Sequence, residues 1–340
     1  MDGSGCPPPK VFTLKDINKV LETSALQIID SIAEGFVAYS KGECVVAPVI
    51  HLGGDEQPLK GGGDCCIKCG FLNDDDFFVV KIAPGSFAGN AQLGIPTNTG
   101  LMLVFSSRTG MLECILLDEG ILTELRTAAC GAIAARLLGP KTVRKIGIVG
   151  TGIQARYQVD MLQHVTPCRE VVLWGRNQQH IEAMKSDLEA KGVGWKVTTT
   201  KDMKELASSC NLIVTVTTAR EALLKSEDIQ PGTHITCVGA DGNGKQELDP
   251  TIFSLADLVV ADSKKQCTSF GEISHGIHAK TISENKVMEF GELIASPTLH
   301  RKGMDDDRIT VLDSAGVAVQ DVQIAKMVFQ SLTSLPRSKL

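Results

Sequence analysis

The spacing of apolar residues changes along the chain and predicts its elements. Over residues 14–39 apolar side chains recur at helical spacing, which predicts one or two helices with Thr13 as an N-cap. Over residues 44–105 short β-rich runs alternate with turn-rich segments, which predicts a mostly antiparallel sheet. The runs are residues 45–50, 77–82 and 101–105.

Helical spacing returns over residues 122–138 and stops at Gly139-Pro140, a pair that ends helices. Strands and helices then alternate strictly, which predicts a doubly wound parallel sheet. The expected strands are residues 145–149, 170–174, 212–217, 234–238 and 258–261. We therefore predict an α/β chain, with the parallel sheet in a domain over 125–316. The second, α+β domain spans 1–124 and is completed by 317–340, where a helical stretch (314–332) can pack back on it.

The composition is that of a soluble globular protein with room for two domains: 340 residues, 43% hydrophobic and 22% charged. The net charge of -6 and the lack of a long basic run argue against binding to nucleic acid or to an anionic membrane. No stretch reaches the roughly 18 apolar residues of a transmembrane helix, and residues 1–10 lack the layout of a secretory signal. We expect an unsecreted protein whose partners are small molecules and copies of itself.

The cysteines predict reduced thiols, because eleven is an odd number and they are spread over the chain. Only Cys65, Cys66 and Cys69 cluster, and zinc and redox sites use the Cys66-x-x-Cys69 spacing. A tetrahedral zinc site needs four ligands, however, and no second pair is evident. We expect ordinary loop thiols and no metal.

The run Gly150-Thr151-Gly152-Ile153-Gln154-Ala155 joins the predicted strand 145–149 to the start of a helix. Gly150 allows a tight turn, Gly152 lets the backbone approach a pyrophosphate, and Ala155 allows close packing of helix on strand. The helix N-terminus offers free N–H groups to phosphates. This context predicts a Rossmann dinucleotide site rather than a structural glycine-rich turn, and the predicted contacts are Gly150, Thr151, Gly152, Ile153 and Gln154.

The end of the second strand of this domain predicts which dinucleotide binds. An acidic side chain that grips the ribose 2′-hydroxyl of NAD is expected there, but the sequence has Gly175-Arg176-Asn177. Arg176 can pair with a 2′-phosphate in forked geometry, and Asn177 can add a hydrogen bond. NADP(H) is therefore favoured over NAD(H). The alternative is that Arg176 is a solvated charge at a strand end.

Open α/β sheets hold their ligands at the carboxyl ends of their strands. Asp241 follows the strand 234–238 at that end, where a carboxylate can handle a proton while hydride moves. The alternative is a turn-stabilising aspartate. Further cofactor contacts are predicted near the ends of the later strands, at Thr215, Thr217, Val238, Gly239, Ser314 and Gly316.

Ordered segments over nearly the whole chain match one known family. They are Val80-Lys81-Ile82, Gly94-Ile95-Pro96-Thr97, Leu125-Arg126-Thr127-Ala128-Ala129, the glycine turn, the run from Gly239 to Asp249, residues 310–316 (TVLDSAG) and Gln320-Asp321. Together they resemble the ornithine cyclodeaminase/mu-crystallin family. Its members include ornithine and lysine cyclodeaminases, archaeal-type alanine dehydrogenases, ketimine reductases and mu-crystallins, which share hydride transfer at the α-carbon of an amino acid or cyclic imine.

The resemblance implies that Lys81 and Arg126 hold the substrate carboxylate and that Asp241 is the acid/base at the reacting nitrogen. Two cations against one carboxylate would fix the substrate over the nicotinamide. The alternatives are a solvated strand lysine at 81 and a structural ion pair at 126. The resemblance also implies that the first domain binds substrate and forms a homodimer, with substrate in the cleft between the domains.

One departure concerns residues 47–52, where many family members carry a third carboxylate-binding cation, an arginine. Here the candidate positions hold Val49 and Ile50. Losing a charged hydrogen bond ordinarily costs about 1.5 to 3 kcal/mol, tenfold or more in affinity. Either Lys81 and Arg126 suffice or the substrate is not a plain α-amino acid, and His51 is a weaker candidate for a substitute donor than for a simple histidine.

Among the family's reactions we favour reduction of a cyclic imine or ketimine acid by NADPH, because a preference for NADP(H) suits a reductase. The alternatives are an ornithine/lysine cyclodeaminase and an alanine-dehydrogenase-type oxidoreductase, the branch that residues 241–249 resemble. The alternative to an enzyme is a protein of the mu-crystallin kind, which binds NADPH or another small ligand without catalysing a reaction. Asp241, which mu-crystallins generally lack, favours an enzyme.

The chain ends in Ser338-Lys339-Leu340, the address read by the peroxisomal import receptor. We expect a peroxisomal protein if the source is eukaryotic and the tail is exposed, and a cytosolic one otherwise. The alternative is a frayed polar tail.

Overall fold

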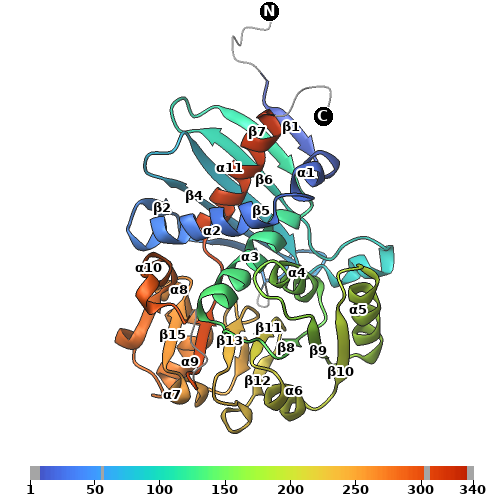
Figure 1. Cartoon of the computed structure of the whole chain (residues 1–340). Coiled ribbons are helices and arrows are strands. Elements are labelled where there is room, and N and C mark those ends of the chain that lie inside the picture. Colours follow the sequence, from blue (N-terminus) through green and yellow to red (C-terminus); the bar gives the residue numbers. More distant parts are fainter. Residues whose placement is uncertain (1–7, 55–56, 302–306, 335–340) are drawn as a thin grey trace, which may run out of the picture. The chain divides into compact units, whose positions relative to one another are not determined.

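Figure 1 shows the computed structural model of the chain, which describes residues 8–54, 57–301 and 307–334. The terminal Ser338-Lys339-Leu340 tripeptide lies outside the described residues. The chain divides into two compact units: a first unit of residues 1–126 and 317–340, and a second unit of residues 127–316. The predicted α/β fold class is confirmed, because an eight-stranded parallel sheet forms in one unit and a mixed sheet with helices in the other.

The first unit holds a seven-stranded sheet in the order β1-β7-β6-β5-β4-β2, with β3 also paired to β4. Only β1 and β7 pair in parallel, so the expected mostly antiparallel sheet is confirmed. Its elements are β1 (Lys10–Thr13), α1 (Leu14–Leu21), α2 (Ala25–Ser40), β2 (Cys44–Val46), β3 (Ile50–Gly53), β4 (Asp64–Leu72), β5 (Phe77–Gly85), η1 (Ala88–Leu93), β6 (Leu101–Ser106), β7 (Leu112–Leu117) and α11 (Ala318–Ser334).

The sheet of the first unit buries one face, because helix α11 packs on β4 and β5 and lies beside α2 (Figure 1). Val79 and Lys81 of β5 point to this face and are buried, whereas Val80 and Ile82 point to the other face and are partly exposed. The predicted return of a C-terminal helix to the first domain is confirmed by α11.

Strand β4 was not predicted, and the expected loop location of the cysteine cluster is wrong. Cys65, Cys66 and Cys69 all lie on β4, which pairs with β5 along its whole length. The preceding Gly61-Gly62-Gly63 run suggested a longer turn region than the chain forms. Cys66 and Cys69 are three positions apart on a strand, so their side chains point to opposite faces and cannot hold one metal ion.

The second unit carries a parallel sheet in the order β10-β9-β8-β11-β13-β17-β15-β16, so the predicted doubly wound sheet is confirmed. Its strands are β8 (Ile146–Val149), β9 (Glu170–Trp174), β10 (Lys196–Thr200), β11 (Leu212–Thr215), β13 (His234–Cys237), β15 (Leu258–Ala261), β16 (Val287–Glu289) and β17 (Thr310–Asp313), with β12 (Arg220–Leu224) and β14 (Gln246–Leu248) as a separate pair.

Helices cover the two faces of this sheet, and two apolar clusters form its core. The strands are buried over nearly all of their length, as expected for a parallel sheet. The helices are α4 (Ile153–Leu162), α5 (Gln178–Ala190), α6 (Met203–Ser209), η2 (Ser226–Asp228), α7 (Ile252–Leu255), α8 (Lys264–Phe270), α9 (Glu272–His278), η3 (Glu284–Lys286), α10 (Phe290–Ala295) and η4 (Pro297–Leu299), and α3 (Ile121–Leu138) spans the division between the units.

Candidate active site

The strand order reverses at β8, which lies between β9 and β11, and this reversal is where open parallel sheets bind ligands. The turn after β8 begins at Gly150, whose φ of +128° is a conformation that side chains rarely adopt. A Cβ at this position would lie 2.9 Å from the carbonyl oxygen of Val216. Glycine is therefore required at 150 for both backbone conformation and space.

Gly152 is the N-cap of α4, and a Cβ built on it meets nothing within 4 Å. The space in front of this helix end is open, and no side chain of the described residues caps it. Thr151 and Gln154 are half-buried beside it, Ile153 is exposed, and Ala155 is fully buried against the sheet. The open cradle and the free N–H groups of α4 fit a dinucleotide pyrophosphate.

Glu247 forms hydrogen bonds to three of the residues that are predicted to contact the cofactor. The sequence had not indicated a role for Glu247. Its carboxylate accepts hydrogen bonds from the Thr215 hydroxyl (2.7 Å), the Thr217 backbone N–H (2.6 Å) and the Gly239 backbone N–H (2.9 Å). Val238 is buried and donates its N–H to the Thr215 carbonyl at 2.9 Å. The ends of β11 and β13 are thus fixed to one another by a buried acid.

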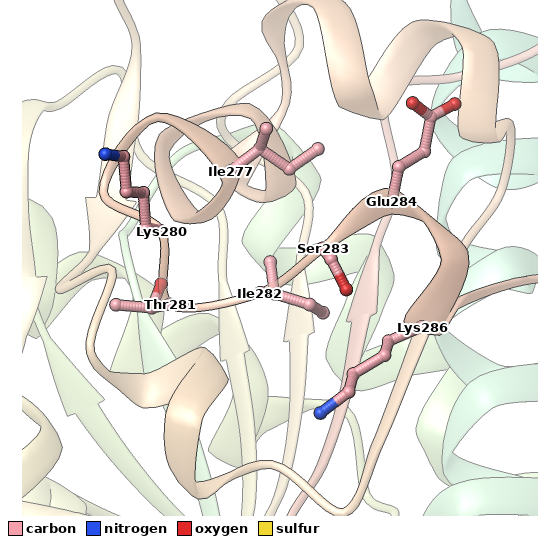
Figure 2. A pocket seen from close by; sticks show the side chains of 7 residues that line it. All are labelled: Ile277, Lys280, Thr281, Ile282, Ser283, Glu284 and Lys286. Atoms are coloured by element: carbon pink, nitrogen blue, oxygen red, sulfur yellow. The ribbon is translucent and has the colours of Figure 1, made fainter.

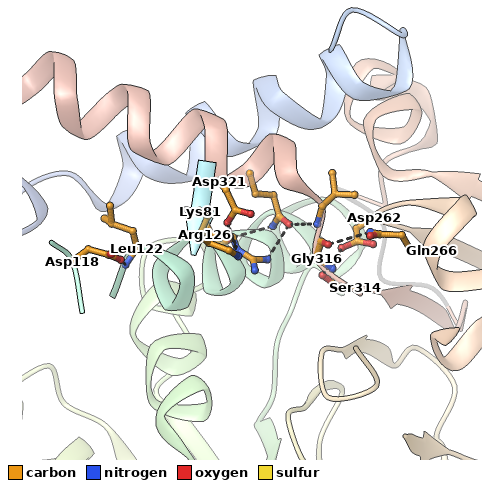
Figure 3. Close-up of polar contacts among 11 residues, drawn as sticks. Lys81, Asp118, Leu122, Arg126, Asp262, Gln266, Ser314, Gly316 and Asp321 are labelled. Carbon is orange, nitrogen blue, oxygen red and sulfur yellow. Dashed lines mark hydrogen bonds and ion pairs between the residues drawn. The ribbon is translucent and has the colours of Figure 1, made fainter. Parts of the chain in front are cut away.

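A second buried acid, Asp262, fixes the chain after β17 (Figure 3). It accepts hydrogen bonds from the Ser314 hydroxyl at 2.9 Å and from the Gly316 N–H at 2.7 Å. The side chain of Gln266 donates to the Gly316 carbonyl at 3.1 Å. Both predicted contacts of this segment are therefore held at the carboxyl end of the sheet.

The loop after β9 presents cationic side chains where the 2′ end of a dinucleotide is expected. Arg176 is exposed, and the side-chain oxygen of Asn177 caps α5 by accepting the N–H groups of Gln179 and His180. Lys201, at the end of β10, donates to the backbone carbonyls of Gly175 and Arg176, each at 2.9 Å. The oxygen of Asn177 is engaged by the helix, and Lys201 adds a cation that sequence analysis missed.

Asp241 lies in the loop after β13, with its side chain 55% exposed. Its carboxylate pairs with the ammonium of Lys245 at 2.5 Å. The ring Nε2 of His275 lies 2.8 Å from the Lys245 carbonyl oxygen and so ties this loop to α9. The carboxylate is open to solvent, so it can exchange a proton with water.

Lys81 and Arg126 meet at one carboxylate inside the first unit (Figure 3). The Lys81 ammonium and the Arg126 Nε each lie 3.1 Å from the same oxygen of Asp321 on α11. All three side chains are buried, so Lys81 is not a solvated strand lysine. The other Asp321 oxygen is buried with no hydrogen-bond partner among the described residues.

The neighbours of this group fix its geometry and its protonation. Gln320 accepts from an Arg126 guanidinium nitrogen at 3.1 Å and donates to the Arg126 carbonyl at 3.2 Å. Burial lowers the pKa of Lys81 to about 8, although Asp321 acts to raise it. Burial would raise the pKa of Asp321, but the charges of Lys81 and Arg126 hold it below its usual value. Asp321 and Gln320 are site residues to which the sequence assigned no role.

The positions at which the family's arginine is missing lie beside β4. Val49 is half-buried, and Ile50 and His51 are exposed on or next to β3. His51 pairs with Cys66 of β4. Neither His51 nor a residue at 49 or 50 supplies a buried cation in place of the arginine.

A separate hollow of about 490 Å³ in the second unit contains none of the predicted site residues (Figure 2). It lies between α9 and η3 and immediately precedes β16, so it is at the amino ends of the parallel strands. The ligand end of such a sheet is the opposite one. Its lining residues are Ile277, Lys280, Thr281, Ile282, Ser283, Glu284 and Lys286.

Comparison with known proteins agrees with this geometry. The sequence matches the ornithine cyclodeaminase/mu-crystallin family over residues 10–335. It is 34% identical to an uncharacterised cyclodeaminase of Sinorhizobium fredii, covering 95% of this chain and 96% of that protein. It is 26% identical to the ketimine reductase mu-crystallin of Mus musculus, covering 96% and 98%. The solved structure of an archaeal alanine dehydrogenase dimer with bound NAD is 30% identical, with a TM-score of 0.83 over 96% of each chain.

These matches define the chain as an NAD(P)-dependent oxidoreductase of a group whose members act on imines and amino acids. It belongs to the ornithine cyclodeaminase/mu-crystallin family, as its motifs implied. Within the described residues, no helix is long and apolar enough to span a membrane.

Proposed function

We propose that this protein reduces the C=N bond of a cyclic imine or ketimine acid with NADPH. The observation that carries the proposal is the buried pair of cations, Lys81 and Arg126, around the single carboxylate of Asp321. Two cations and one anion leave a net charge of +1 away from water, which favours an anionic substrate. The relative named ketimine reductase supports an imine as the group that is reduced.

In the proposed reaction, Lys81 and Arg126 hold the substrate carboxylate and so orient the imine carbon. NADPH, when bound, would supply a hydride for this carbon, and the nitrogen would take up the electron pair of the C=N bond. Asp241, whose side chain is open to solvent, takes up a proton from water and delivers it to that nitrogen. Glu247 and Asp262 keep the cofactor-contacting loops in place without touching the reacting atoms.

The test is steady-state NADPH oxidation with Δ1-pyrroline-2-carboxylate and Δ1-piperideine-2-carboxylate. We expect turnover by the intact protein, loss of turnover in Asp241→Asn, and unchanged NADPH affinity in that variant. Asp249→Asn is a control from the same segment. Tight NADPH binding with no turnover of any imine would instead support a non-catalytic binding protein, and full activity of Asp241→Asn would remove Asp241 from the mechanism.

We further propose that the cofactor is NADP(H) rather than NAD(H). Arg176 is exposed at the end of β9, Lys201 lies against the same loop, and the loop offers no acidic side chain for a ribose 2′-hydroxyl. The N-terminus of α5, capped by Asn177, adds a positive dipole end. Arg176→Asp should weaken NADPH binding tenfold or more and leave NADH binding nearly unchanged. Equal affinities of the wild type for both cofactors would overturn this assignment.

Amino-acid oxidation is the second candidate function, because the archaeal alanine dehydrogenase shares 30% identity and the fold over 96% of the chain. The same assay with alanine, ornithine and lysine and either oxidised cofactor separates the candidates. Turnover of alanine alone indicates a dehydrogenase. Release of ammonia from ornithine or lysine without net change in cofactor indicates a cyclodeaminase.

We propose a homodimer formed through the open face of the first unit's sheet. On this face Phe78 and Phe105 stack with ring centroids 4.8 Å apart, and Val80, Leu103 and Ile115 are partly exposed beside them. Contiguous apolar surface of this kind marks an interaction site. Leu103→Glu should convert a dimer into a monomer in size-exclusion chromatography with light scattering, whereas a monomeric wild type would overturn the proposal.

The terminal Ser338-Lys339-Leu340 supports a further proposal, peroxisomal import. In a eukaryotic cell, a fluorescent protein fused to the N-terminus of the full chain should enter peroxisomes, and deletion of Leu340 should leave it in the cytosol. Cytosolic fluorescence of the full chain would count against import.

A further inference from the structure

Lys68 is a third buried cation of the first unit. It lies on β4 directly opposite Lys81 of β5, and residues that face one another in an antiparallel pair project from the same side of the sheet. This side carries α11, the helix of Asp321. Lys68 is only 9% exposed, although lysine is rarely buried in proteins. Its charge acts on both Lys81 and Asp321.

The position of Lys68 relates it to the arginine that this chain lacks. Val46 pairs with Gly70 and Ile50 pairs with Ile67, so the register of β2 and β3 leaves Pro48 and Val49 opposite Lys68. Residues 47–52 are the segment in which, by the resemblance, many family members carry the arginine. The neighbouring strand therefore presents a cation across from the site of the missing one.

We propose that Lys68 binds the substrate carboxylate together with Lys81 and Arg126 and replaces the missing arginine. This inference rests on the proposed reduction of an imine acid. It names Lys68 as the residue that makes the enzyme prefer substrates with a carboxylate. Lys68, Lys81 and Arg126 against Asp321 leave a net charge of +2 among these four side chains, so a bound carboxylate is compensated without an arginine at 49. An ammonium is a point charge, so it tolerates a shift of position between strands better than a forked guanidinium does.

The first experiment compares Lys68→Met with Lys60→Met, which removes an exposed lysine from the loop before β4. Lys68→Met should raise the KM for Δ1-pyrroline-2-carboxylate tenfold or more, with a much smaller change in kcat. Lys60→Met should change neither constant. Lys68→Arg, which keeps a cation, should retain most of the affinity.

The second experiment removes the cation at residue 68 and places an arginine in the segment 47–52. Val49→Arg added to Lys68→Met should restore the KM at least in part, because residue 49 faces Lys68. Ile50→Arg added to the same variant should not, because Ile50 pairs with Ile67 and so lies on the other face of the sheet. Retention of the fold in each variant is checked by its NADPH affinity.

Competition between two flat analogues separates a role in binding from a role in packing. The inhibition constant of pyrrole-2-carboxylate divided by that of pyrrole-2-carboxamide should rise tenfold or more in Lys68→Met. An equal loss for both ligands, or an unchanged ratio in an active enzyme, overturns the role of Lys68. Failure of the wild type to reduce any imine acid is a different result, because it removes the proposed function together with this inference.

Discussion

In the first unit the buried charges around the predicted substrate residues are cations that share one carboxylate. In the second unit the buried charged groups near the carboxyl ends of the parallel strands include the carboxylates of Glu247 and Asp262. Lys81 and Arg126 are both paired with Asp321. Glu247 and Asp262 instead accept hydrogen bonds from backbone N–H groups and hydroxyls. Glu272 likewise accepts the N–H groups of residues 247 and 248.

The two arrangements shift pKa values in opposite directions. In the first unit the pKa of Asp321 is lowered because Lys81 and Arg126 outweigh the effect of burial. In the second unit burial, together with the charge of Asp262, raises the pKa of Asp313 to about 7. Burial, with the charges of Asp313 and Glu247, also raises the pKa of Glu272 well above its usual value.

This difference indicates two roles for buried charge. The cations of the first unit can bind an anion, and the acids of the second unit hold loops in place. A buried cation pair with one anion favours a further anion, which suits a substrate carboxylate. Acids that accept backbone N–H groups have no such surplus, and they fix the loops that are proposed to contact the cofactor. Substitutions in each group of charges should show whether it has the role that its partners indicate.

Asp321→Asn should have the largest effect. It leaves Lys81 and Arg126 buried without their counter-ion, and removal of one member of a buried ion pair costs about 3 to 5 kcal/mol. The free energy of unfolding, measured in urea at neutral pH, should fall by this amount. Asp76→Asn, which breaks the exposed pair with Arg108, is the control and should cost at most about 1 kcal/mol. If the two substitutions lowered the free energy of unfolding equally, burial of the Asp321 ion pairs would not increase their contribution to stability.

Asp313 should make the second unit less stable as the pH rises. Its pKa is about 7 in the folded protein and 3.8 by default, so the folded state binds the proton more tightly. The stability that results is fully present below about pH 4 and is lost as the pH rises through about 7. Between about pH 5 and pH 8 the loss is about 3 kcal/mol.

The measurement is the free energy of unfolding of wild type and Asp313→Asn over this pH range. Asparagine keeps an oxygen that can accept the Ile273 N–H, so the variant should fold and lose much of the pH dependence. Burial also raises the pKa of Glu289 to about 7, which leaves a residual slope of the same sign. A wild type that becomes more stable between pH 5 and pH 8 would contradict the raised pKa values.

Glu247→Gln should have a smaller effect, and mainly on the cofactor. One carboxylate oxygen accepts the Thr217 N–H and the other accepts from Thr215 and Gly239. A glutamine amide places an NH₂ group against one of these donors and leaves it unpaired, which costs about 1 to 3 kcal/mol. We expect the Kd of NADPH to rise about tenfold in fluorescence titration. Glu221→Gln, on an exposed part of β12, should leave it unchanged.

Patterns local in sequence were sufficient for most of the second unit. The strand of residues 145–149, the turn at Gly150 and the helix after it each follow from consecutive residues, and the structure has them as β8, its turn and α4. Strand β4 could not be predicted in this way. It mixes cysteine, lysine and glycine, and its most deeply buried positions include Lys68 and Gly70, so its residue types do not show the apolar/polar alternation that marks a half-exposed strand.

The residues that pair with the predicted site residues could not be predicted from the sequence for a different reason. Asp321 is 240 positions from Lys81 along the chain, and Glu247 is 32 from Thr215, so only folding brings each pair together. The resemblance named Lys81, Arg126 and Asp241, but no local pattern marks the acid that two of them share. Nor did spacing reveal Lys68, whose place beside Lys81 depends on the register of β4 and β5.

Lys245→Gln should have the smallest effect on stability. It tests whether an exposed ion pair contributes less to stability than the buried charges of either unit. The Lys245–Asp241 pair is close, at 2.5 Å, but the two side chains are 29% and 55% exposed. Water screens such a pair, and we expect a loss of less than about 1 kcal/mol in the free energy of unfolding. Lys19→Gln, which breaks the surface pair with Asp16, should cost about as little. The kcat for imine reduction should nevertheless fall in Lys245→Gln alone, because Asp241 loses the contact that orients it. A loss of several kcal/mol of stability would mean that this pair is structural, like that of Asp321, and that Asp241 is not a free acid/base.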